Sequence, residues 1–174
     1  WVAHPHPDGF WDRYSPTADQ YSKLSLPILT ITGIYDGDQP GALRYYREHM
    51  KHASAQERAR HLLVIGPWDH AGTRAPRAQF AGLQVGPAAL VDLSQLHVEW
   101  YEWTMKRGLR PEFLKNNVAY YMLGAETWRY ADSLETITSE EQRLYLNSSG
   151  SALDVFASGS LGDAIGTGAD EYVY

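Results

Sequence analysis

The stretch that decides the fold reads PILTITG, residues 27–33, a run of apolar and β-branched side chains ended by glycine. Such a run predicts a buried strand. After a polar turn, residues 40–52 have the pattern of a helix, with proline in the first turn and Asp38 placed to cap it. Residues 62–65, LLVI, predict a second buried strand that ends at Gly66. Strand, turn, helix and strand in this order predict a βαβ unit and therefore a parallel sheet.

The second half of the chain changes character. Residues 88–107 predict an amphipathic helix that stops near Gly108. Its predicted inner face consists of residues three or four positions apart, namely Leu90, Leu93, His97, Trp100 and Thr104. Beyond residue 116 the helical period disappears, and short strands are predicted at residues 119–123, 143–147, 153–156 and 172–174. Strands separated by glycine-rich turns favour a β-sandwich or jelly roll, which is incomplete here because a full jelly roll needs about eight strands.

Composition excludes several classes of protein. With 174 residues, 44% hydrophobic and 21% charged, the chain has the composition of a globular protein. A net charge of −6 argues against nucleic acid as a partner, and the longest aliphatic run is too short to span a membrane. The absence of cysteine excludes disulfides, thiolate metal sites and a cysteine nucleophile, but leaves the compartment open.

Asp36 and His70 are the residues with the clearest chemical potential. Each follows a predicted parallel strand, so both side chains are expected at the carboxyl edge of the sheet, where active residues collect. An Asp followed by a His is the second half of the order Ser, Asp, His in α/β-hydrolases. There the His removes a proton from serine, and the Asp fixes the tautomer of the ring. An Asp in a turn and a His in a loop also occur without any such role.

Two other classes of function remain open from the residues alone. A metal-dependent hydrolase could use Asp36, Asp38 and His70 as ligands. A non-catalytic β-sandwich binding module could present exposed aromatic side chains as a ligand platform; the candidates are Tyr120, Tyr121 and Tyr145. A histidine-rich start, His4 and His6 between prolines, is more consistent with a structural role than with a metal site.

The sequence also resembles a known superfamily. Residues 33–37, GIYDG, and 66–70, GPWDH, resemble the Asp and His motifs of the cocaine esterase and X-Pro dipeptidyl peptidase superfamily, which includes α-amino acid ester hydrolases and glutaryl acylases. Residues 1–11 resemble the lead-in from its cap region, and the segments 144–146 and 159–161 resemble the start of its jelly roll. The resemblance implies an α/β-hydrolase fold with a helical cap and a β-jelly roll. It also implies that Asp36 and His70 are the catalytic Asp and His.

The resemblance suggests a domain organisation. Residues 1–25 would end the cap region, residues 26–112 would form the C-terminal part of the α/β-hydrolase domain, and residues 113–174 would start the jelly roll. The chain starts with Trp1 and contains no Gly-x-Ser-x-Gly; the nearest string, SGSLG at 158–162, lacks the first glycine. We therefore expect a fragment that carries the base and its orienting residue without the nucleophile and is inactive by itself.

The expected reaction is hydrolysis of esters or amides through an acyl-enzyme, with no metal and no cofactor. The expected partners are a small ester, amide or peptide substrate and the N-terminal part of the same enzyme, and neither nucleic acid nor membrane. Asp38 and Trp68 are candidate substrate contacts. The place equivalent to Asp38 is acidic in superfamily members that act on α-amino acid esters, where a carboxylate could pair with an ammonium group; the alternative is that Asp38 only caps a helix.

Overall fold

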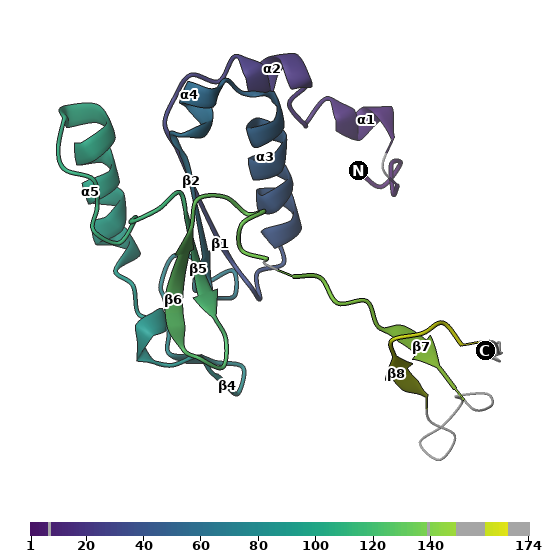
Figure 1. The fold of residues 1–174 in the computed structure, drawn as a ribbon. Helices are drawn as coiled ribbons and strands as arrows, with labels where there is room; N and C mark the ends of the chain where they lie inside the picture. The colour runs from purple at the N-terminus through teal and green to yellow at the C-terminus, as the bar shows by residue number, and fades with distance from the viewer. Residues whose placement is uncertain (7, 139, 149–158, 167–174) are drawn as a thin grey trace. The chain divides into compact units, whose positions relative to one another are not determined.

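The structure is a computed structural model that describes residues 1–6, 8–138, 140–148 and 159–166. The chain divides into two compact units, Trp1–Ile137 and Thr138–Tyr174 (Figure 1). The helices and strands of the first unit are α1 (Gly9–Asp12), α2 (Ala18–Ser22), β1 (Ile28–Gly33), α3 (Gln39–His52), α4 (Ala55–Arg58), β2 (His61–Gly66), β3 (Gln79–Phe80), β4 (Leu83–Gln84), the 3-10 helix η1 (Pro87–Ala89), α5 (Leu93–Lys106), β5 (Val118–Met122) and β6 (Thr127–Ala131). The second unit contains β7 (Tyr145–Asn147) and β8 (Ser160–Gly162).

The main sheet of the first unit has the strand order β1-β2-β5-β6. Strand β1 pairs with β2 in parallel, β2 pairs with β5 in parallel, and β6 closes the series as an antiparallel hairpin with β5. The predicted βαβ unit and its parallel sheet are therefore confirmed, and the fold is a mixed α/β fold.

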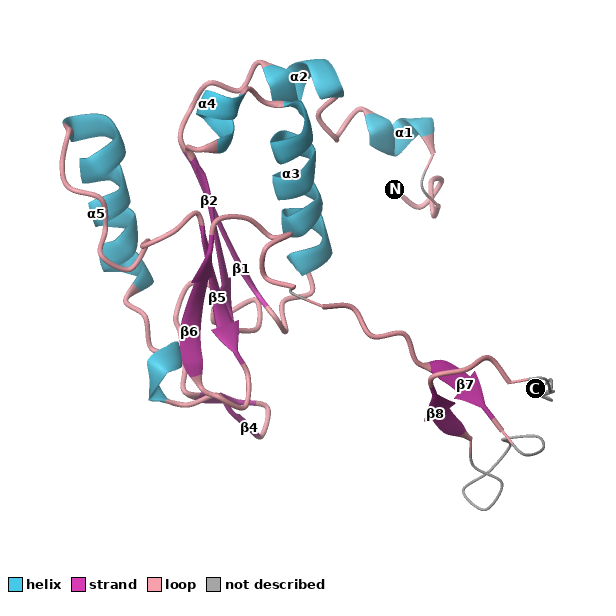
Figure 2. Ribbon diagram, in the orientation of Figure 1, coloured by secondary structure: helices cyan, strands magenta, loops and turns pink. Residues whose placement is uncertain are grey.

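Helices cover both faces of this sheet (Figure 2). Side chains along a strand alternate between faces, and β2 follows this rule. Leu63 packs with Tyr46 of α3, whereas Leu62 and Val64 pack with Trp100 of α5. Residues 62–65 of β2 are all apolar, because a strand between two helical layers has no face exposed to water.

Helix α5 differs from its prediction at both ends. It begins after Asp92, whose side chain accepts a hydrogen bond of 2.9 Å from the backbone N–H of Gln95, so Leu90 lies outside it. At the other end Arg107, and not Gly108, adopts the left-handed conformation, with a φ of 61°. The buried face of the helix consists of Leu93, Leu96 and Trp100. The predicted His97 is instead exposed and contacts the Leu93 carbonyl oxygen at 2.6 Å through Nδ1.

The expected domain boundary after residue 112 differs from the structure. Strand β5 belongs to the main sheet, since Leu63 of β2 is in register with Val118, and the division between compact units falls after Ile137. In the second unit, β7 and β8 form an antiparallel pair. The strands predicted at 153–156 and 172–174 lie outside the described residues, and a jelly roll is not established by one hairpin.

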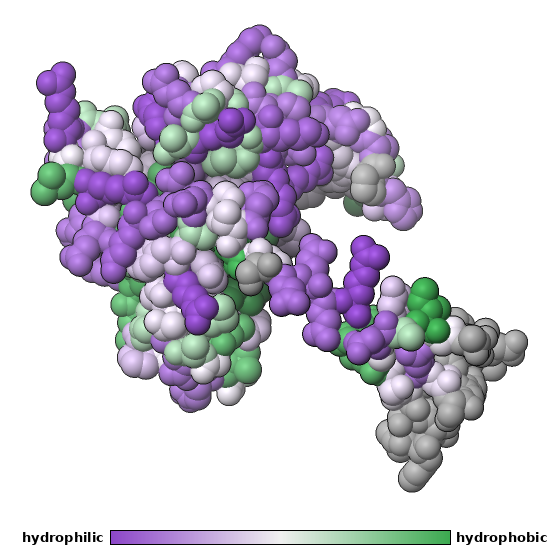
Figure 3. All heavy atoms as spheres, viewed as in Figure 1, coloured by the Kyte–Doolittle hydropathy of each residue, from purple (hydrophilic) through white to green (hydrophobic). Residues whose placement is uncertain are grey.

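The surface of the first unit is hydrophilic over much of α3 and α4, with hydrophobic patches toward the end of the unit that contains β4 (Figure 3). Among the described residues, no helix is both long enough and apolar enough to cross a membrane.

Candidate active site

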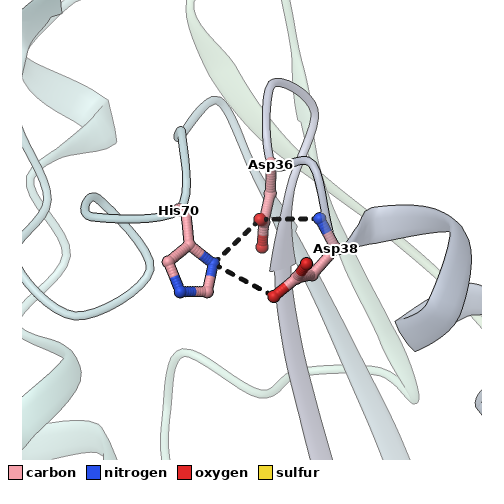
Figure 4. Close-up of side chains that lie close together, drawn as sticks. All are labelled: Asp36, Asp38 and His70. Atoms are coloured by element: carbon pink, nitrogen blue, oxygen red, sulfur yellow. Dashed lines mark hydrogen bonds and ion pairs between the residues drawn. The ribbon is translucent and has the colours of Figure 1, made fainter. Parts of the chain in front are cut away.

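The register of β1 and β2 determines where the site forms. Gly33, the last residue of β1, is paired with Gly66, the last residue of β2. The two strands therefore end at the same level of the sheet, and the loops that follow them lie side by side. These loops carry Asp36 and His70, so the expected meeting at the carboxyl edge occurs (Figure 4).

Asp36 is held in a tight turn at the end of β1. Its backbone N–H donates to the Gly33 carbonyl oxygen at 3.1 Å, and its side chain is only 6% exposed. Its Oδ1 accepts a hydrogen bond of 3.0 Å from the backbone N–H of Asp38 and lies 3.0 Å from Nδ1 of His70. Two donors thus compensate the cost of burying this carboxylate.

His70 is more open than its partner, with 53% of its side chain exposed. Because an ionised carboxylate can only accept hydrogen bonds, the contact with Asp36 places the ring proton on Nδ1. The lone pair of Nε2 is then available to accept a proton. The hydroxyl of Thr73 donates to the His70 carbonyl oxygen at 2.7 Å and helps to hold the loop.

Trp68 holds the His loop from inside the protein. Its side chain is 1% exposed within the core that α5 covers, and its Nε1 donates to the Ala89 carbonyl oxygen at 3.0 Å. A Cβ on Gly66 would overlap the indole ring, so glycine is required where the ring packs. The expectation that Trp68 contacts substrate is corrected here, because a ring buried in the core supports the loop and offers no surface to a ligand.

Asp38 does not cap helix α3 with its side chain. It occupies the N-cap position without a side-chain hydrogen bond, and its carboxylate Oδ2 lies 3.4 Å from His70 Nδ1. The side chain is 80% exposed. The alternative that Asp38 only caps the helix is therefore corrected, since the carboxylate is directed to the histidine.

Asp36, Asp38 and His70 are also the one group of potential metal ligands found among the described residues. Their ligand atoms lie within 4.8 Å of one another. Two carboxylate oxygens and an imidazole nitrogen form a donor set suited to a divalent cation. The histidines of the N-terminal segment do not add to it: His4 pairs with Asp8 at 2.7 Å and stacks on Phe10. The imidazole of His4 is thus engaged by a side chain.

Arg74 is the residue near the site that the sequence analysis missed. Its Nη2 lies 3.5 Å from Nε2 of His70, on the side of the ring opposite to the carboxylates. The residues between them form a turn, with the N–H of Thr73 donating to the Asp69 carbonyl oxygen at 3.2 Å. The four-residue separation is the only sequence signal that relates Arg74 to His70, and four-residue separations are too common to point to a site.

The comparisons with known proteins concern the family and the fold. Residues 1–72 match the family described as "X-Pro dipeptidyl-peptidase (S15 family)", and this range includes Asp36 and His70. The resemblance to that superfamily is therefore confirmed over the matched residues.

A solved structure supports the same view of the fold. An aminopeptidase from a marine sediment archaeon, Thaumarchaeota archaeon, superposes with a TM-score of 0.62 and 22% sequence identity over 86% of this chain. The chain spans 24% of the length of that aminopeptidase. None of the curated proteins matches the chain.

Proposed function

We propose that this chain is part of a serine hydrolase that cleaves ester or amide bonds, including peptide bonds, with His70 as the general base and Asp36 as its orienting carboxylate. The observation that carries this proposal is the 3.0 Å contact between the buried Asp36 carboxylate and Nδ1 of a histidine whose side chain is 53% exposed. The match of residues 1–72 to a peptidase family supports the same reaction class.

The proposed mechanism uses His70 twice. Its Nε2 takes the proton of a serine hydroxyl as that oxygen attacks the substrate carbonyl, and the resulting imidazolium is stabilised by the buried Asp36. The imidazolium then gives the proton to the leaving alcohol or amine, leaving an acyl-enzyme. Water, activated by the same nitrogen, releases the acid. The sequence contains no Gly-x-Ser-x-Gly, so we place the nucleophile and the oxyanion hole in a segment outside residues 1–174.

The substrate is proposed to be a small ester, amide or peptide. Asp38 adds a negative charge beside the site and, at 80% exposure, can meet a solvated group. A substrate with a free α-amino group would place an ammonium within reach of such a carboxylate, which a charge-assisted hydrogen bond would favour. Neither a metal nor a cofactor is required by the mechanism.

A metal-dependent hydrolase is the second candidate, because Asp36, Asp38 and His70 have their ligand atoms within 4.8 Å. The binding-module alternative has less support: Tyr121, one of its three proposed platform residues, is buried and donates through its hydroxyl to the Val85 carbonyl oxygen. A burial of this kind removes the ring from any ligand platform.

The test uses a fluorophosphonate probe, which reacts with activated serines. The complete enzyme should be labelled at one serine, His70→Ala should abolish both labelling and turnover, and Asp36→Asn should lower kcat by about 10⁴-fold. No serine within residues 1–174 should be labelled. Labelling inside this range would contradict the proposal, and loss of turnover on chelation would favour the metal-dependent alternative.

A further inference from the structure

One N–H group of the site faces two carboxylates, and the proposed triad uses only one of them. Nδ1 of His70 lies 3.0 Å from Asp36 Oδ1 and 3.4 Å from Asp38 Oδ2 (Figure 4). The first carboxylate is buried and the second is largely exposed. Water screens the second contact, so Asp36 is the stronger acceptor of the two.

The backbone directs Asp38 to the histidine. A residue at an N-cap usually has an extended backbone and accepts a hydrogen bond from the first turn of the helix. Asp38 instead has φ −88° and ψ −3°, and makes no such bond. Its own N–H is bound by Asp36 Oδ1 at 3.0 Å. The two carboxylates and the imidazole therefore form one connected cluster, in which Asp36 positions the residue that also contacts His70.

We propose that Asp38 is a positioning residue that shares the Nδ1–H of His70 with Asp36. When the Asp36 carboxylate is removed, Asp38 becomes the acceptor and keeps the ring in the Nδ1–H tautomer. That this tautomer matters for hydrolysis rests on the proposed function. Which tautomer His70 adopts can be measured whatever reaction the protein catalyses. A test of the ring by spectroscopy therefore separates a failure of this proposal from a failure of the proposed reaction.

The experiment measures the tautomer of His70 in the 174-residue chain labelled with ¹⁵N-histidine, from the long-range ¹H–¹⁵N couplings of the neutral ring. Alanine replaces Asp36, because the amide of an asparagine could itself donate to Nδ1 and impose the other tautomer. All variants carry Arg74→Ala, because the guanidinium near Nε2 would favour the Nδ1–H form by itself. In this background the otherwise unchanged chain and Asp36→Ala should both show the Nδ1–H form, and Asp36→Ala/Asp38→Ala should shift to the Nε2–H form. A shift already complete in Asp36→Ala, or absent in the double variant, would overturn the proposal.

A matched control removes another carboxylate next to His70. Asp69 precedes His70 in the chain, but its Oδ1 accepts from the N–H of Gly72 at 2.7 Å, a bond that asparagine can also accept. Asp36→Ala/Asp69→Asn should therefore keep the Nδ1–H form. If Asp36→Ala does not fold, the exposed substitution Asp38→Ala decides alone: exchange of the Nδ1 proton with water should accelerate several-fold over wild type, and an unchanged rate would overturn the proposal.

Discussion

Gly33 and Trp68 are packed backbone against backbone, and a Cβ on Gly33 would overlap the Trp68 carbonyl oxygen. The same carbonyl oxygen accepts a hydrogen bond of 3.0 Å from the N–H of Tyr35. This contact ties the loop after β1 to the loop after β2. Asp36 follows Gly33 in the first loop, and His70 follows Trp68 in the second. The distance between these two catalytic candidates therefore depends on the contact between Gly33 and Trp68.

The first prediction concerns this contact. Gly33→Ala should lower the free energy of unfolding by about 1–3 kcal/mol, since the backbone must move to admit the methyl group. Urea unfolding measures the change. Gly41 in helix α3 is the matched control, because nothing lies within 4 Å of a Cβ there. Gly41→Ala should raise the free energy of unfolding by about 0.5–1 kcal/mol through helix propensity. A loss at Gly33 no greater than that at exposed positions would contradict the packing described here.

The second prediction concerns a buried histidine pair that links α3 to the sheet. His61 lies 3.0 Å from His49 between their Nδ1 atoms, and its Nε2 lies 2.8 Å from the Thr30 hydroxyl. Burial, and then the neighbouring His49, lower the pKa of His61 from 6.5 to about 3. Burial also lowers the pKa of His49, against smaller opposing effects of a hydrogen bond with the Leu24 backbone and of Glu57. The rings of Tyr45 and Tyr46 pack against His61, and burial raises the pKa of Tyr46 to about 12.

The sign follows from proton binding. Below pH 6.5 the unfolded chain takes up protons at these histidines and the folded chain does not. The free energy of unfolding should therefore fall as pH decreases from about 6.5 toward 3, and above pH 6.5 these histidines should cause no further change in it. Urea unfolding over this range tests it. His61→Gln should flatten the slope, while the exposed control His6→Gln should keep it. A free energy of unfolding in wild type that does not change with pH would contradict the prediction.

The third prediction separates recognition of a substrate ammonium from general effects at Asp38. In the complete enzyme, Asp38→Asn should reduce kcat/KM for α-amino acid esters by an amount corresponding to about 1.5–3 kcal/mol, the value of a hydrogen bond to a charged group. Neutral acyl esters should be nearly unaffected, because Asp36 still orients His70. Paired hydrolysis assays on the two ester classes measure the difference. Equal losses on both classes would show that Asp38 does not recognise the ammonium.

Much of the first unit could be predicted from local patterns. The run at 62–65 is apolar because its strand is covered on both faces, whereas four of the six residues of β1 are only half-buried. Strands β1 and β2 agree with the predicted runs to within about a residue at each end. Helix α3 was predicted for similar reasons, since a proline in its first turn marks its start. Strand β6 was not predicted, because its side chains alternate between exposed and half-buried and include the polar Arg129.

The membership of β5 in the main sheet could not be predicted either. Residues 119–123 have the pattern of a strand, but pairing with β2 requires contact between residues more than fifty positions apart. A strand's own sequence does not specify which neighbour it pairs with, so the position of the domain boundary was missed. The left-handed Arg107 was missed as well: glycine favours that conformation, yet the helix adopts it one residue before Gly108.

By itself, the sequence determined the order of strand, helix and strand and the placement of Asp36 and His70 after the two strands. Both follow from backbone periodicity and from the rule that parallel strands end at one edge. Only the tertiary structure decided that Trp68 is buried beneath the site, that Asp38 turns to His70 instead of capping its helix, and that Arg74 lies on the other side of the ring. Those outcomes depend on distances between separate loops, which the register of β1 and β2 sets and which no local pattern of residues encodes.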